Sequence, residues 1–163
     1  MYLGKGRIMT TIIYISILLL IMDQISKILV IKFLDMNNSI ELIKNFFYLT
    51  YTHNTGAAFS ILTGQRLLLI LIAVIILILI FNYIRKNKVE GKIEKIAFSL
   101  IIGGSLGNLI DRIVRGFVVD FLDFKIFGYN FPIFNLADTF IVVGVLLLLI
   151  TTITRKEVKD DNW

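Results

Sequence analysis

The stretch LLLILIAVIILILIFNYI, residues 67–84, decides the fold class. A helix that crosses a hydrocarbon core of about 30 Å needs roughly 20 consecutive, mostly apolar residues. Three further stretches, at about 10–33, 96–112 and 137–153, are also long and apolar enough to cross. We therefore expect an all-α membrane protein with four transmembrane helices, forming a single domain over residues 1–163.

The composition of the whole chain agrees with this expectation. Hydrophobic residues make up 57% of the chain, and its mean hydropathy is +0.84, far above the average for soluble domains. There is no cysteine, which excludes disulfides, thiolate metal ligands and a cysteine nucleophile. The single histidine, His53, excludes a metal site built from several histidines.

The positive charges predict an orientation in the membrane. Cytoplasmic flanks of transmembrane helices are enriched in lysine and arginine. Basic residues gather before the first helix, between the second and third, and after the fourth: Lys5, Arg7, Arg85, Lys86, Lys88, Lys92, Lys95, Arg155, Lys156 and Lys159. We therefore expect cytoplasmic N- and C-termini, with segments 34–66 and 113–136 outside. The net charge of +5 is explained by this bias, so we expect no nucleic-acid partner. No small-x-small cleavage site follows the first helix, so we expect it to be retained.

The two external segments have patterns typical of β-strands. Apolar and polar residues alternate from Phe47 to His53, and the stretch from Phe117 to Phe124 is rich in β-branched and aromatic residues. Gly128-Tyr129-Asn130 indicates a turn, and Pro132 marks a bend before the fourth helix. We expect a small extracytoplasmic β-sheet whose aromatic side chains lie at the membrane interface.

Two aspartates at the edges of apolar runs are the first candidates for chemistry. Asp120 lies in FVVDFLDF and Asp138 in FNLADTF. An ionisable group at membrane depth costs about 2.5 to 3.5 kcal/mol or more, so it usually faces a polar site. Structural explanations remain open: Asp138 can simply stabilise a helix N-terminus, where Asn135 is an alternative cap. Asp120 can be an exposed strand residue.

Other polar residues fall near the same depth. Asp23 and Lys27 have the i,i+4 spacing of an ion pair, as do Asp111 and Arg115. The third helix carries a polar stripe together with small residues that permit close helix approach: Gly103, Gly104, Gly107, Asn108 and Arg112.

Two further titratable residues are expected to lie apart from any catalytic pair. Asp123 is three residues from Asp120, so in a strand it would face the opposite side. We expect His53 at the interface or surface rather than in catalysis. These arguments reduce the number of acidic residues that are candidates for catalysis, but they do not decide which two form a catalytic pair.

Five motifs in order along the chain carry a family resemblance. They are Asp23-x-x-x-Lys27, NTGAAF from Asn54 to Phe59, GNLIDR ending at Arg112, VVDF around Asp120, and FNLAD ending at Asp138. Together they resemble bacterial lipoprotein signal peptidase, also called signal peptidase II, and the match extends from the first helix to the fourth.

The resemblance implies an aspartic endopeptidase in the bacterial cytoplasmic membrane, with its active site toward the extracytoplasmic face. Such an enzyme removes the signal peptide from diacylglyceryl-modified prolipoproteins, cutting N-terminal to the lipidated cysteine. It implies a catalytic pair at Asp120 and Asp138, no metal and no cofactor, and we expect a monomer that contacts membrane lipids. Substrate-binding or supporting positions fall on Asp23, Lys27, Asn54, Gly56, Asn108, Arg112, Asn135 and Ala137.

Two other classes of protein remain as alternatives. In an ion or proton transporter, Asp23, Lys27 and Asp138 would form a relay. Transporters of that kind usually carry polar groups through both leaflets or show two similar halves, whereas the inner halves of these helices are almost wholly apolar. A structural membrane subunit would not need the aspartate pair.

Overall fold

The four apolar stretches form helices. The computed structural model describes residues 2–57, 61–87, 89 and 91–160, with the backbone alone at 2–5 and 155–160. The helices are α1 (Tyr2–Phe33), α2 (Arg66–Lys86), α3 (Lys92–Val114) and α4 (Leu136–Asp160). Each contains a span whose length and composition suit a membrane crossing. The helices extend past the predicted ranges at one or both ends, because helical hydrogen bonding continues into polar flanks that hydropathy leaves out.

The two segments between helices form one antiparallel sheet. Its strands are β1 (Ser39–Ile43), β2 (Phe47–Asn54), β3 (Val118–Ile126) and β4 (Tyr129–Asn130), in the order β1-β2-β3-β4. The strands predicted from Phe47 and from Phe117 are thereby confirmed as β2 and β3. Phe47 lies opposite Phe124 and Thr52 opposite Asp120, with a register shift between them. The β2–β3 pairing therefore brings together two segments that are far apart in sequence.

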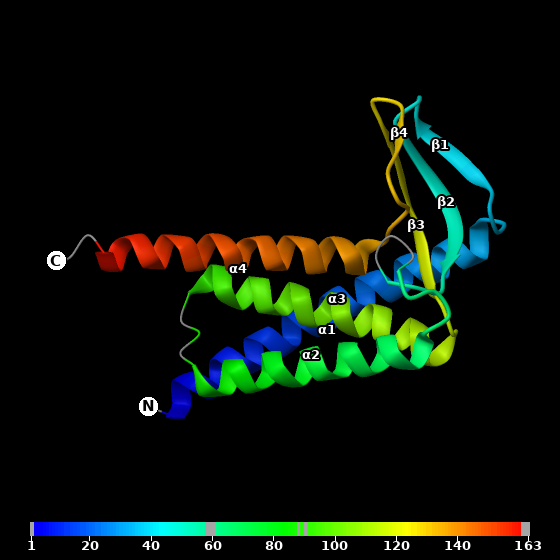
Figure 1. Cartoon of the computed structure of the whole chain (residues 1–163). Coiled ribbons are helices and arrows are strands. Elements are labelled where there is room, and N and C mark those ends of the chain that lie inside the picture. The colour runs from blue at the N-terminus through cyan, green and yellow to red at the C-terminus, as the bar shows by residue number, and fades with distance from the viewer. Residues whose placement is uncertain (1, 58–60, 88, 90, 161–163) are drawn as a thin grey trace.

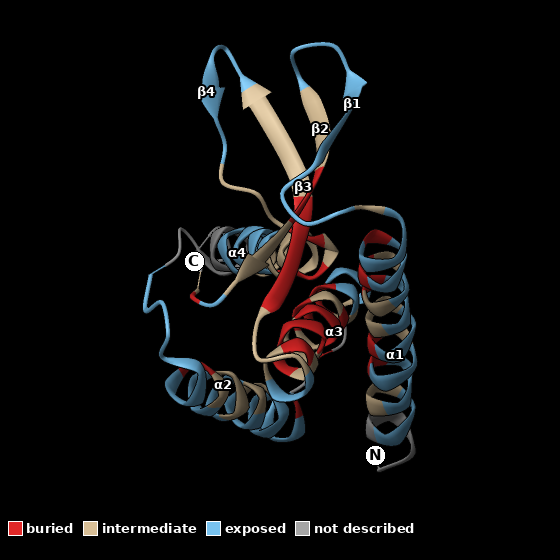
Figure 2. Cartoon of the chain, turned by 90° about the vertical axis from the view of Figure 1, so that its right-hand side faces the viewer, coloured by how far each residue is buried: buried red, intermediate tan, exposed pale blue. Residues whose placement is uncertain are grey.

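The third helix forms the centre of the bundle. Most buried helical residues belong to α3, which lies between α1 and α4 (Figure 2). Its glycines permit this packing: a Cβ at Gly104 would meet the Ala137 carbonyl, and one at Gly107 would meet the Asp23 carboxylate. The expected structural role of these small residues is confirmed.

Helix α2 contributes little to the core. Its apolar side chains are mostly exposed, and Leu69 and Ile84 are its buried residues. Many apolar side chains of α1 and α4 are exposed as well. Such surfaces are unfavourable in water and suit a hydrocarbon environment, where lipid chains cover them.

The sheet stands at one end of the bundle, roughly across the helix axes (Figure 1). The start of α1, the ends of α2 and α4 and the start of α3 lie at the opposite end. The fourth helix begins at the sheet, so the polar residues near its start meet those at the end of α3.

Candidate active site

The two candidate aspartates meet at the junction of sheet and bundle. Asp120 lies in β3 and is 1% exposed, while Asp138 lies in the first turn of α4 and is half-buried. Asn135, fully buried, contacts both carboxylates. Its side-chain Nδ2 donates to Asp120 Oδ1 at 2.6 Å, and its backbone N–H donates to Asp138 Oδ2 at 3.3 Å. One residue therefore bridges the pair.

The same residue caps α4. The backbone N–H of Asp138 donates to Asn135 Oδ1 at 2.9 Å, which makes the contact between the two residues reciprocal. This is the capping-box arrangement, in which two backbone donors at a helix start are satisfied at once. Both structural explanations for the helix start are therefore realised together, because Asn135 is the cap and Asp138 is the acidic residue of the first turn.

Two further asparagines donate to the carboxylates. Asn54, at the end of β2, donates from Nδ2 to Asp120 Oδ2 at 2.9 Å. Asn108, on α3, donates from Nδ2 to Asp138 Oδ1 at 2.7 Å. Each carboxylate is thus held through both oxygens, which fixes its orientation.

Burial dominates the electrostatics of Asp120. Desolvation, together with the nearby charge of Asp138, raises the pKa of its carboxyl to about 7, although the amides of Asn54 and Asn135 act in the opposite direction. A carboxyl with this pKa exchanges a proton readily near neutral pH.

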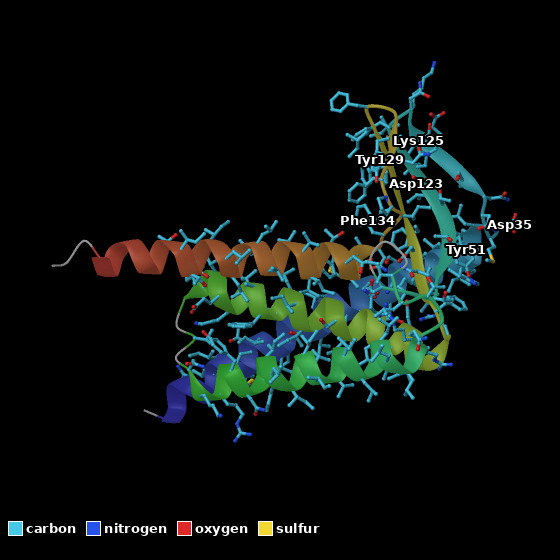
Figure 3. All side chains as sticks on the ribbon, viewed as in Figure 1. Asp35, Tyr51, Asp123, Lys125, Tyr129 and Phe134 are labelled. Carbon is cyan, nitrogen blue, oxygen red and sulfur yellow. The ribbon has the colours of Figure 1, made fainter. Side chains whose placement is uncertain are left out.

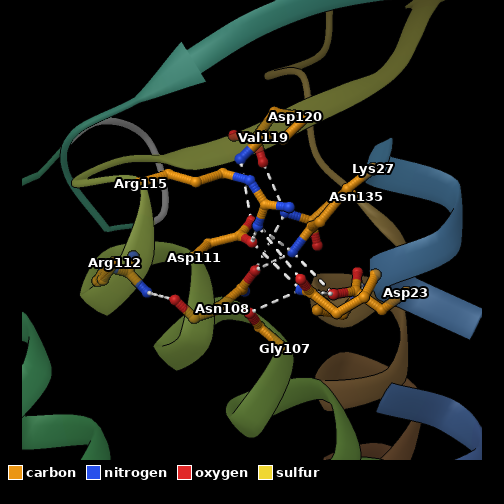
Figure 4. Close-up of polar contacts among 12 residues, drawn as sticks. Asp23, Lys27, Gly107, Asn108, Asp111, Arg112, Arg115, Val119, Asp120 and Asn135 are labelled. Carbon is orange, nitrogen blue, oxygen red and sulfur yellow. Dashed lines mark hydrogen bonds and ion pairs between the residues drawn. The ribbon is translucent and has the colours of Figure 1, made fainter. Parts of the chain in front are cut away.

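Next to Asp120 and Asn135 lies an ionic cluster of Asp23, Lys27, Asp111 and Arg115 (Figure 4). The predicted pairing of Lys27 with Asp23 is confirmed at 2.9 Å, and Lys27 also binds Asp111 Oδ2 at 2.9 Å. The predicted pairing of Arg115 with Asp111 is confirmed too. Asp23, Lys27 and Asp111 have no exposed surface, so each charge depends on the others.

The cluster is connected to both α4 and the site. Asp23 Oδ1 accepts the backbone N–H of Ala137, a fully buried residue, at 3.0 Å. Lys27 Nζ donates to Asn108 Oδ1 at 3.0 Å, and Asn108 in turn donates to Asp138. The ion pair on α1 therefore holds the start of α4 and orients Asn108.

Arg112 and Gly56 connect α3 to the loop after β2. Arg112 Nη2 donates to the Gly56 carbonyl at 2.8 Å, and the Gly56 N–H donates to Asn54 Oδ1 at 2.9 Å. Arg112 thereby supports Asn54, which holds Asp120. Of the NTGAAF motif, Ala58 and Phe59 lie outside the described residues.

Two residues expected to lie apart from the pair do so. Asp123 accepts from Thr50 at 2.7 Å and lies further along β3, away from the helices (Figure 3). His53 bonds to the Tyr51 hydroxyl at 2.7 Å and stacks on Phe117, and burial lowers the pKa of its imidazole.

Two members of the network are not among the predicted site residues. Gln24 donates to both Asp23 and Asp111, and Asp111 contacts Lys27 and β3 as well as Arg115. Asp111 lies in the GNLIDR motif and at i,i+4 spacing from Arg115, but neither signal predicts its contacts with Lys27 and β3, and Gln24 has no signal in the sequence. Within the described part of the chain, no three His, Cys, Asp or Glu side chains are grouped so that they could hold a metal ion.

Comparison with known proteins decides the family. The family described as signal peptidase (SPase) II matches residues 15–154. The chain belongs to the signal peptidase II family. It is 41% identical to the lipoprotein signal peptidase of Haemophilus ducreyi over 91% of this chain and 94% of that protein. Its identity to the lipoprotein signal peptidase of Halothermothrix orenii is 44%, over 91% and 99%.

Solved structures agree with the family assignment. One bacterial membrane enzyme superposes with a TM-score of 0.85 at 38% identity, covering 90% of each chain. A second gives 0.80 at 39% identity, covering 88% of this chain and 92% of the other. The resemblance drawn from the five motifs is confirmed: this signal peptidase II family member is a membrane-embedded, multi-pass protease of lipoprotein processing.

Proposed function

We propose that the protein cleaves the signal peptide from diacylglyceryl-modified prolipoproteins, N-terminal to the lipidated cysteine, with Asp120 and Asp138 as an aspartyl dyad. The observation that carries the proposal is the bridge through Asn135, which bonds to both carboxylates. Two carboxylates that share a bridging residue and repel each other electrostatically do not readily ionise together, so we expect the pair to share one proton.

The shared proton allows acid and base catalysis in one step. The ionised carboxylate accepts a proton from water while the water oxygen attacks the scissile carbonyl carbon. The protonated carboxyl donates its proton to the carbonyl oxygen, giving a tetrahedral diol. When the C–N bond then breaks, the protonated carboxyl donates its proton to the leaving nitrogen, and the ionised carboxylate takes a proton from one diol hydroxyl. The products are a carboxyl group and an amine, and the dyad again holds one proton. The proton belongs to the pair rather than to either residue, and the chemistry requires no metal or cofactor.

The remaining residues of the site position the dyad. Asn54, Asn108 and Asn135 hold the carboxylate oxygens. Arg112 and Gly56 support Asn54. Asp23, Lys27 and Ala137 fix the start of α4 and the orientation of Asn108. Asp138 is half-buried whereas Asp120 is buried, so the peptide approaches the pair from the side of Asp138.

We place the site at the extracytoplasmic face of the bacterial cytoplasmic membrane. The sheet and the dyad lie at the end of the bundle opposite the start of α1 and the end of α4, and those two ends carry basic residues typical of the cytoplasmic side. At this boundary the lipid chains of a prolipoprotein can stay in the bilayer. We expect a monomer to be the working unit.

Replacing each aspartate by asparagine tests the proposal. Asp120→Asn and Asp138→Asn keep the shape of the side chain and remove the ionisable group. Cleavage of a lipidated prolipoprotein should fall by at least ~10², the usual contribution of acid and base catalysis. Asp123→Asn is the matched control in the same strand and should lose far less. Activity should also survive chelators. Near-normal turnover by either dyad variant, in folded protein, would contradict the proposal and reopen the transporter alternative.

A further inference from the structure

We propose that Asp111 is a positioning residue for Asp120, because its carboxylate fixes the backbone of the neighbouring residue Val119. The inference rests on the catalytic role proposed above for Asp120. Asp111 Oδ2 accepts the backbone N–H of Val119 at 3.2 Å, and both residues have no exposed surface. A side chain of the central helix therefore holds the strand one residue before the dyad aspartate.

With this contact, the backbone N–H groups of both residues that flank Asp120 are hydrogen-bonded. In an extended strand, alternate N–H groups point to the same edge. On the edge of β3 away from β2, the N–H of Val119 is held by Asp111 and the N–H of Phe121 by the Phe134 carbonyl at 2.9 Å. The opposite edge pairs with β2, where Asp120 lies across from Thr52. The position of Asp120 along the strand depends on these contacts together.

Asp111 is itself a rigid acceptor. Its carboxylate binds Lys27 Nζ at 2.9 Å and Gln24 Nε2 at 3.2 Å from α1, and the guanidinium of Arg115 one turn along α3. A carboxylate held by so many donors cannot rotate without breaking several of them. An ionised acceptor also strengthens the bond to the Val119 N–H.

The same side chain is linked to the second dyad aspartate. Lys27, shared by Asp23 and Asp111, donates to Asn108, and Asn108 donates to Asp138. Asp111 therefore reaches Asp120 through Val119, and Asp138 through Lys27 and Asn108. Loss of its carboxylate should shift the two catalytic groups relative to each other, and a displacement near 1 Å can reduce catalysis about 10²-fold.

Three variants separate positioning from stability. Asp111→Leu removes both the charge and the acceptor for Val119. Asp111→Asn removes the charge and keeps an oxygen acceptor. Arg115→Gln removes an ion pair of the same cluster, while Asp111 keeps its bonds to Lys27 and Val119. All three should lower the melting temperature of the full-length protein in detergent.

The kinetics and the amide exchange should differ among the variants. In Asp111→Leu, kcat should fall about 10²-fold with little change in KM, the pattern of a lost transition-state interaction. Asp111→Asn should lose much less, and Arg115→Gln should stay closest to the wild type. Hydrogen–deuterium exchange of the peptide that contains Val119 should accelerate in Asp111→Leu and not in Arg115→Gln.

Equal kcat in folded Asp111→Leu and Arg115→Gln, or unchanged exchange at Val119, would overturn the proposal. If Asp111→Leu does not fold, an ester linkage in place of the Val119 amide removes the N–H donor, weakens the Val118 carbonyl as an acceptor, and leaves every ion pair intact. That analogue should show the same loss of kcat, and normal kcat in it would equally overturn the proposal. The exchange measurement needs no turnover, so it tests the Asp111 contact even if the Asp120→Asn result were to disprove the dyad.

Discussion

The carboxylate of Asp23 on α1 accepts a hydrogen bond from the backbone N–H of Ala137, in the first turn of α4, at 3.0 Å. The first N–H groups of a helix have no partner within that helix. Asp23 supplies one from a residue 114 positions away, while its other oxygen binds Lys27. An ion pair in one helix thus fixes the start of another helix, the one that carries Asp138.

Asp23→Asn should therefore reduce stability along with activity. The amide keeps an oxygen for Ala137 but no longer balances Lys27, and breaking a buried pair costs about 3 to 5 kcal/mol. We expect a loss near the lower end, since Lys27 retains Asp111. Thermal unfolding in detergent measures the effect. A variant as stable as the wild type and yet inactive would instead indicate a direct chemical role for Asp23.

The raised pKa of Asp120 predicts a pH dependence of stability. Burial and the charge of Asp138 raise this pKa from the model-peptide value of 3.8 to about 7. Between these values the folded protein binds the proton more tightly than the unfolded chain, so this residue's contribution to stability is largest at acidic pH and is lost as pH rises toward 7. Asp120→Asn removes this dependence.

The wild type should therefore lose stability as the pH is raised from 5 to 8, and Asp120→Asn should lose less, so the melting temperature of the variant should rise relative to that of the wild type. Melting temperatures of the two proteins at both pH values provide the test, and the Asp123→Asn variant controls for charge elsewhere on β3. A difference in melting temperature that stays constant across this range would mean that Asp120 is ionised throughout it.

Replacing the closely packed glycines of α3 by alanine should destabilise the protein, although helix propensity alone predicts that alanine would stabilise it. Alanine is the better helix former by about 1 kcal/mol. At Gly107, however, its Cβ would meet the Asp23 carboxylate, and at Gly104 the Ala137 carbonyl. Overpacking of this kind typically costs about 1 to 3 kcal/mol. Gly107→Ala and Gly104→Ala should therefore lower the melting temperature.

Gly6→Ala is the matched control for these variants. Gly6 also lies in a helix, and nothing lies within 4 Å of a Cβ built there. This variant should be neutral or slightly stabilising. If Gly107→Ala behaves like Gly6→Ala, then α3 is not packed against Asp23 as closely as described.

Hydropathy predicted the four helices, and strand-like patterns predicted β2 and β3, because each depends on local sequence. No pattern predicted β1, and Tyr129–Asn130, expected in a turn, forms β4. The run at 67–84 became α2, and the alternation after Phe47 became β2. The contacts that assemble the site are of a different kind, since they join elements far apart in the chain. Helical spacing placed Asp111 on the same face as Arg115, but it does not say which helix or strand that face meets. The bonds from Asp111 to Lys27 and Val119 therefore appear only in the folded structure.

The orientation of the bundle is a prediction that single cysteines can test, because the chain has none of its own. Asn87 follows α2, between Lys86 and Lys92, and Tyr129 lies at the distant edge of the sheet, 63% exposed. The basic residues predict that the first position faces the cytoplasm. In spheroplasts, a membrane-impermeant maleimide should label Tyr129→Cys directly and Asn87→Cys only after permeabilisation. The cysteine-free wild type shows the background, and labelling of both variants in intact spheroplasts would rule out this topology.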